Sequence, residues 1–156
     1  MRMPPPEVAA HLDRLRSTSR DLVSLVTGAE PAALRREPMP GEWSAATVVS
    51  HLADAELVYG VRLRLIVAED RPMLTAFDEE AWADRFADVD DEPKETLTRW
   101  RALRDSNLRL LDALVDGEWE RTGVHQQKGI MSVTAVVKLL AEHDRAHLDQ
   151  IRHALA

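Results

Sequence analysis

The chain has 156 residues, 45% of them hydrophobic, which is enough for a domain with its own core, so we expect residues 1–156 to form a single domain. The net charge of −7, with no local Lys/Arg cluster, argues against nucleic acid or an anionic membrane as a partner. We find no signal-like segment and no apolar run of the roughly 20 residues that span a membrane, so we expect a cytoplasmic protein, and the lack of cysteine excludes disulfides and thiolate ligands.

Two long helices are predicted in the first half of the chain. The first covers residues 6–27, where apolar residues recur in alternating steps of about four and three until Gly28. A connection rich in proline and glycine follows over residues 29–43. Ser44 is then suited to cap a second helix that runs to about Ala68.

The second half of the chain begins with a long connection over residues 69–92. We expect Asp78 to cap a short helix within that connection. A third long helix begins near Pro93 and ends at residues 116–117, and a fourth begins after Ser132 and continues nearly to the last residue. No strand alternation of useful length is present.

Four amphipathic helices of similar length cover one another's apolar faces most simply in a four-helix bundle, so the predicted fold class is all-α. The long connection between the second and third helices allows a crossover that carries the short extra helix. We therefore expect an up-down-down-up bundle, in which the second and fourth helices are antiparallel.

Two histidines lie one helical turn apart on the apolar face of the fourth predicted helix. His143 and His147 share that face with apolar residues at positions 136, 140, 151 and 154. A third histidine, His51, lies on the core-facing stripe of the second helix, and antiparallel packing brings it to a similar height.

Three neutral imidazoles suit zinc, nickel, cobalt or iron(II), and we expect zinc or nickel before iron(II). Because no carboxylate is evident for a fourth position, His51, His143 and His147 predict an open site that accepts water or substrate. The alternative is a set of hydrogen-bonded or solvated histidines with no metal.

Several motifs resemble the DinB-like (DinB/YfiT) superfamily over most of the chain. They are Trp43-Ser44, the segment 51–56, the segment 143–151 and the loop 125–129. The resemblance implies a four-helix bundle whose divalent metal is held by His51, His143 and His147. Many such proteins carry a histidine immediately before the last ligand, where this chain has Ala146.

The resemblance implies an enzyme that acts on a small molecule, because the superfamily contains transferases and an isomerase that use low-molecular-weight thiols, as well as hydrolases. We predict thiol-dependent S-transfer ahead of metal-dependent hydrolysis. Since the chain has no cysteine, the thiol would be a cosubstrate. A third hypothesis is a non-catalytic, metal-stabilised binding module or homodimer, paired through Leu52, Tyr59 and Leu63.

Five further residues are candidates for the pocket, each with a structural alternative. Asp144 and Gln150 flank the histidine face and could orient a ligand imidazole, or could be ordinary polar residues at the bundle edge. Arg62 could bind an anionic group, or could pair with a buried acid such as the side chain at position 54 or 56. Asn107 could face the cavity or set helix register, and His125 could transfer protons from a loop or be solvated there.

Overall fold

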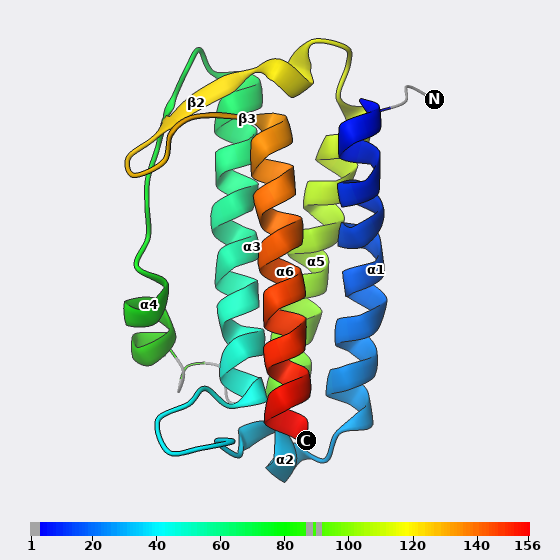
Figure 1. Cartoon of the computed structure of the whole chain (residues 1–156), viewed down its shortest axis with the longest axis vertical. Coiled ribbons are helices and arrows are strands. Elements are labelled where there is room, and N and C mark those ends of the chain that lie inside the picture. The colour runs from blue at the N-terminus through cyan, green and yellow to red at the C-terminus, as the bar shows by residue number, and fades with distance from the viewer. Residues whose placement is uncertain (1–3, 87–88, 90–91) are drawn as a thin grey trace.

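A computed structural model describes residues 4–86, 89 and 92–156 of the chain. Four long helices lie side by side along the molecule (Figure 1): α1 (Pro6–Gly28), α3 (Ala45–Ala68), α5 (Pro93–Ala113) and α6 (Val133–Leu155). The predicted domain 1–156 and the predicted connection 69–92 both include residues outside those described, namely 1–3, 87–88 and 90–91.

The helices confirm the predicted up-down-down-up order. In Figure 1, α1 and α6 run downward while α3 and α5 run upward, and a long crossover joins the ends of α3 and α5. Helix α3 packs against both α5 and α6, and α1 packs mainly against α6. The antiparallel contact between α3 and α6 is the one that positions the predicted histidine site.

Side-chain caps fix where three of the helices begin. The side-chain oxygens of Ser44, Asp78 and Ser132 each accept a hydrogen bond from the backbone N–H three residues later, at 3.2, 3.0 and 3.1 Å. These bonds satisfy amides that a helix leaves without a partner in its first turn. They confirm the predicted starts of α3, of the short helix α4 (Glu79–Phe86) and of α6.

The connections contain short elements that periodicity did not predict. They are α2 (Pro31–Arg35), the 3-10 helix η1 (Glu118–Glu120) and three strands, β1 (Met73–Leu74), β2 (Thr122–His125) and β3 (Gly129–Ser132). The strands have two to four residues, too few to show an alternation of useful length, and they are minor beside the long helices of the predicted all-α bundle. The third long helix also ends at Ala113, earlier than predicted.

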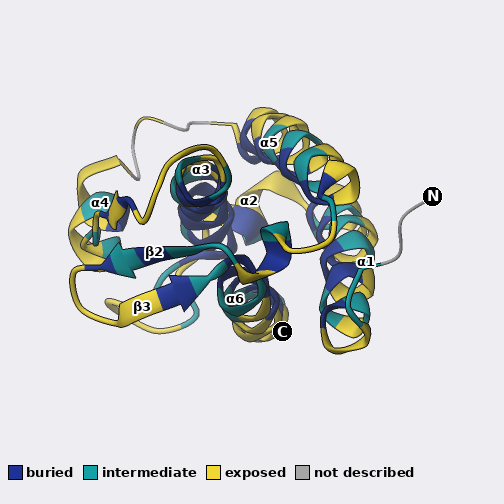
Figure 2. Ribbon diagram, turned by 90° about the horizontal axis from the view of Figure 1, so that it is seen from above, coloured by how far each residue is buried: buried dark blue, intermediate teal, exposed yellow. Residues whose placement is uncertain are grey.

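The strands pair across distant parts of the chain. Strand β1 pairs in parallel with β2, and β2 pairs antiparallel with β3. Seen from above in Figure 2, β2 and β3 cross the end of the bundle over α3 and α6. The sheet closes that end of the bundle and anchors the start of the crossover.

A polar layer divides the bundle core into two apolar parts. The guanidinium of Arg104 lies in this layer and bonds to Glu56 and Asp144, each at 2.7 Å, and the side chains of all three residues are 1% exposed. Apolar residues that include Leu15, Leu63 and Leu140 fill the core on the side of the sheet, and Leu22, Leu52 and Ile151 belong to the other part.

The predicted dimer surface is wrong at all three of its residues. Leu52, Tyr59 and Leu63 are 1%, 6% and 0% exposed, because α3 turns them into the bundle. They pack within one chain and present no face to a second copy. Among the described residues, no helix combines the length and the apolar character that crossing a membrane requires.

Candidate metal centre

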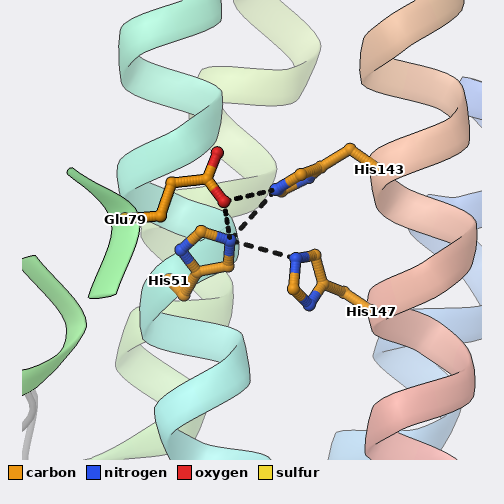
Figure 3. Close-up of side chains that lie close together, drawn as sticks. All are labelled: His51, Glu79, His143 and His147. Carbon is orange, nitrogen blue, oxygen red and sulfur yellow. Dashed lines mark hydrogen bonds and ion pairs between the residues drawn. The ribbon is translucent and has the colours of Figure 1, made fainter. Parts of the chain in front are cut away.

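The three predicted histidines meet between α3 and α6. The Nε2 atom of His51 lies 3.0 Å from Nε2 of His143 and 3.1 Å from Nε2 of His147. Figure 3 shows the three rings pointing toward one another from the two helices. The equal heights follow from the antiparallel packing that the crossover permits.

The spacing of these nitrogens fits a metal ion better than hydrogen bonds among the rings. A neutral imidazole carries one N–H, so His51 can donate from Nε2 to only one of its two neighbours. Nδ1 of His147 lies 2.8 Å from Oε1 of Gln150, an acceptor, so Nδ1 carries the proton and the lone pair on Nε2 faces the centre. Ring nitrogens bound at about 2.0–2.1 Å around a tetrahedral ion would be only slightly farther apart.

Glu79 adds a carboxylate that the sequence analysis did not find. Its Oε2 lies 3.8 Å from Nε2 of His51 and 3.9 Å from Nε2 of His143 (Figure 3). Its ligand atom and those of the three histidines all lie within 4.8 Å of one another. An acidic residue in the first turn of a helix is common, so nothing local to Glu79 distinguished it.

The environment favours the protonation states that bind metal. Burial lowers the pKa of His51 to about 4, with further lowering by His147 and His143 and an opposing effect of Glu79. Burial also lowers the pKa of His147, and the neighbouring imidazole of His143 is the main cause of the lowered pKa of Glu79. Near neutral pH, His51 and His147 are therefore neutral and Glu79 is ionised.

Two more residues hold the imidazoles in place. The ring of Trp43 stacks on His147 with a centroid distance of 6.5 Å and an interplanar angle of 17°, and its centroid lies 5.3 Å from that of His51. Gln150 fixes His147 from the other side, which agrees with the predicted orienting role. A cavity of about 390 Å³ borders His147, and Trp43, Gln150 and Glu80 contribute to its lining.

Asp144 and Asn107 belong to the polar layer of the core. Asp144 is 1% exposed and its recorded bond is to Arg104, so the expectation of a residue at the bundle edge or of an imidazole partner was wrong. Nδ2 of Asn107 donates to Oε1 of Glu56 at 2.7 Å. Asn107 therefore links α5 to α3. Of its two predicted roles, this is the one that sets helix register.

Arg62 and His125 are buried in the sheet half of the molecule. Nη2 of Arg62 donates to the carbonyl oxygen of Thr75 at 2.8 Å, and neither of the predicted acids pairs with it. His125 is 3% exposed within β2, where its Nδ1 accepts hydrogen bonds from two backbone N–H groups at 3.1 and 3.2 Å. The expected solvated loop position of His125 was wrong, and His125 lies outside the histidine and glutamate cluster.

Comparisons with known proteins agree with this architecture. The family described as the DinB superfamily matches residues 11–151. A protein of Geobacillus kaustophilus named "Putative metal-dependent hydrolase" is 30% identical over 154 residues, with 93% of this chain and 82% of that protein covered. A protein of Oceanobacillus iheyensis with the same description is 27% identical over 145 residues, with 93% and 83% covered.

A solved structure matches the whole fold. It belongs to YfiT from Bacillus subtilis, described as "a probable metal-dependent hydrolase with an unusual four-helix bundle topology". The two structures superpose with a TM-score of 0.86 at 23% sequence identity, covering 99% of this chain and 89% of the other. At this identity the likeness establishes the shared fold.

Proposed function

The chain belongs to the DinB superfamily, and from that premise we propose that it is a metal-dependent hydrolase of a small molecule. The observation that carries the proposal is the convergence of three imidazole nitrogens with the carboxylate of Glu79. His51, His143 and His147 would hold the ion. Zinc or nickel, and after them iron(II), suit such a set of ligands.

The residues around the centre would have different roles in hydrolysis. A divalent ion held there would supply Lewis acidity, which favours deprotonation of water near pH 7. Glu79 is ionised and its side chain is 44% exposed, whereas that of His51 is 1% exposed. We assign to Glu79 the acceptance of the proton from the attacking water and its return to solvent or to the leaving group.

Thiol-dependent S-transfer is the second candidate, and the same groups could serve it. The chain has no cysteine, so a low-molecular-weight thiol would enter from solvent, and Glu79 could accept its proton. The cavity of about 390 Å³ beside His147 has room for part of such a molecule. Hydrolysis takes precedence because Glu79 provides a proton acceptor that the sequence analysis lacked, and because similar proteins carry that description.

A non-catalytic module is the least favoured of the three hypotheses. A structural metal site is closed by four protein ligands and excludes solvent. Here the carboxylate is half-exposed and a cavity reaches His147. Access of this kind supports exchange of small molecules at the centre.

Elemental analysis combined with activity assays tests the proposal. The purified protein is expected to contain about one divalent ion per chain, and His147→Ala should lose it because one of three imidazoles is removed. His11→Ala is the matched control, since His11 lies on α1 outside the cluster. Hydrolysis of a panel of small esters and amides, with and without added thiol, then separates the two reactions. A wild-type protein without metal, or a His147→Ala protein that keeps it, would reject the site.

A further inference from the structure

Arg62 is a buried cation, and among the described residues no acidic side chain forms a hydrogen bond or an ion pair with it. The residue is 6% exposed, and its only hydrogen bond within that part of the chain goes to the carbonyl oxygen of Thr75. Its Nε is buried without a partner. Its Cζ lies 5.3 Å from the ring centroid of Tyr59 and 5.9 Å from that of Phe77, so aromatic rings cover the charge without neutralising it.

Arg104, the other deeply buried arginine, shows how this protein neutralises a guanidinium that serves structure alone. Two carboxylates, those of Glu56 and Asp144, contact it at 2.7 Å. The Nε of Arg104 also lacks a partner, so the difference between the two arginines lies in the neutralising charge. Burying a cation without a counter-ion is costly, which makes Arg62 a candidate for binding an anionic ligand.

Arg62 lines a cavity of about 440 Å³ between α3, the crossover and α4. Most of the wall is apolar, and it includes Leu57, Val61, Leu65, Phe77 and Trp82. Its charged groups are Arg62 and Asp78, and the carboxylate of Asp78 accepts a hydrogen bond from the N–H of Ala81 at 3.0 Å. Ligand sites are commonly apolar cavities in which a few polar groups orient the ligand, and here the guanidinium of Arg62 has no acidic partner in the part of the chain that the structure describes. Leu57 and Val61 are 47% and 50% exposed, so the cavity opens to solvent along α3.

The crossover connects this cavity to the candidate metal centre. Thr75, which holds Arg62, and Glu79, which faces the histidines, are the ends of one short segment that descends along α3 (Figure 1). The backbone of Arg62 lies about 16 Å beyond that of His51 along α3. Because side chains on a helix lean toward its N-terminus, the side chain of Arg62 leans toward His51. Tyr59 lies between Arg62 and the candidate metal centre, because its ring centroid is 5.3 Å from Cζ of Arg62 and 6.1 Å from the ring centroid of His143.

We propose that Arg62 binds the carboxylate of a small substrate whose apolar part lies in this cavity and whose reacting end reaches the metal centre. This inference rests on the proposed function and names the substrate class of that site. A carboxylate fits better than a phosphate, because one guanidinium balances one negative charge and Asp78 and Glu79 would repel a dianion.

Calorimetric titration with hexanoate and with its neutral analogue hexanamide tests the charge recognition directly. The wild-type protein, treated with chelator, is expected to bind hexanoate about tenfold or more tightly than hexanamide. Arg62→Gln should remove that preference. Arg85→Gln loses the same charge from an exposed position on α4 that does not line the cavity, and it should keep the preference.

A second variant guards against misfolding of Arg62→Gln. Val61→Glu leaves Arg62 in place and sets a carboxylate at the half-exposed rim, so it should weaken hexanoate binding more than hexanamide binding and reduce the preference. Equal binding of the two probes by the wild type, a preference that survives Arg62→Gln, or a preference that Val61→Glu does not reduce, overturns the inference. Metal content of His147→Ala reports on the proposed function separately, because the titration uses metal-free protein.

Discussion

At the scale of single residues, Glu79 decides how the centre would work. Its Oε2 stands 3.8 and 3.9 Å from two imidazole nitrogens that are themselves only 3.0 Å apart, so it lies at the edge of the cluster. A carboxylate in that place suits a proton acceptor better than a fourth ligand of a closed site.

Replacing Glu79 by glutamine tests this assignment. Glu79→Gln keeps the shape but cannot accept a proton, so we expect kcat of hydrolysis to fall by about 10²–10⁴-fold while metal content stays unchanged. Kinetics and elemental analysis on the same sample measure both. Asp84→Asn, at an exposed position of α4 outside both cavities, should have near wild-type values. Loss of the metal in Glu79→Gln would contradict this assignment and indicate that Glu79 is a metal ligand.

Gln150 is expected to act through His147. Its Oε1 accepts the Nδ1 proton of His147 at 2.8 Å, which leaves Nε2 free for the ion. Gln150→Ala should therefore weaken metal affinity about 10- to 100-fold, measured by competition with a chromophoric chelator. Glu142→Ala, exposed on the same helix, is the control. An unchanged affinity in Gln150→Ala would show that the bond does not orient the ring.

At the scale of elements, the polar layer sets the axial register of α3, α5 and α6 relative to one another. Glu56, Arg104 and Asp144 come one from each helix, and Asn107 adds a second bond from α5 to Glu56. A slip of any helix along its axis would break these short bonds inside a low-dielectric core. Asp144 follows His143 directly, so the same layer sets the height of the histidine pair.

Arg104→Met is the matching experiment. It leaves the carboxylates of Glu56 and Asp144 buried without a cation, and we expect the free energy of unfolding to fall by about 3–5 kcal/mol. Urea denaturation followed by circular dichroism measures the change. Arg101→Met, at an exposed position of α5, should change stability by less than about 0.5 kcal/mol. A loss below about 1 kcal/mol in Arg104→Met would refute this view of the layer.

At the scale of the whole molecule, the candidate metal centre ties together three separate helices. His51 comes from α3, Glu79 from α4, and His143 and His147 from α6. An ion held there binds the folded chain far better than the unfolded one, since only folding assembles the ligands. Cytoplasmic location, absence of nucleic-acid binding, a homodimer and a single domain over residues 1–156 stay predictions.

Metal removal should therefore destabilise the fold. With zinc at about 1,000 times its Kd, linkage adds about 4 kcal/mol to the free energy of unfolding. Thermal unfolding in the presence of zinc or of a chelator should show a higher Tm with the metal. His51→Ala should abolish the difference, because it removes the only α3 ligand. Equal Tm values for the wild-type protein in both conditions would speak against a bound ion.

The long helices and the three histidines could be predicted because their signals are local. Apolar residues at helical spacing predicted α1, α3, α5 and α6, and the spacing of His143 and His147 placed both rings on one face. The strands could not be predicted in this way, because β1 and β2 exist only by pairing with each other across the chain. The predicted surroundings of Asp144 and His125 were wrong for the same reason, because their partners come from packing between distant parts of the chain.

The sequence by itself determined an all-α bundle and three histidines suited to metal, since periodicity and helical spacing need only neighbouring residues. Only the tertiary structure decided that Glu79 faces those histidines and that Arg62 lines a cavity with no bond to an acidic side chain among the described residues. Both depend on the path of the crossover along α3. That path is set by the sheet, by the cap at Asp78 and by packing against α3, and no local pattern in the chain encodes their combined result.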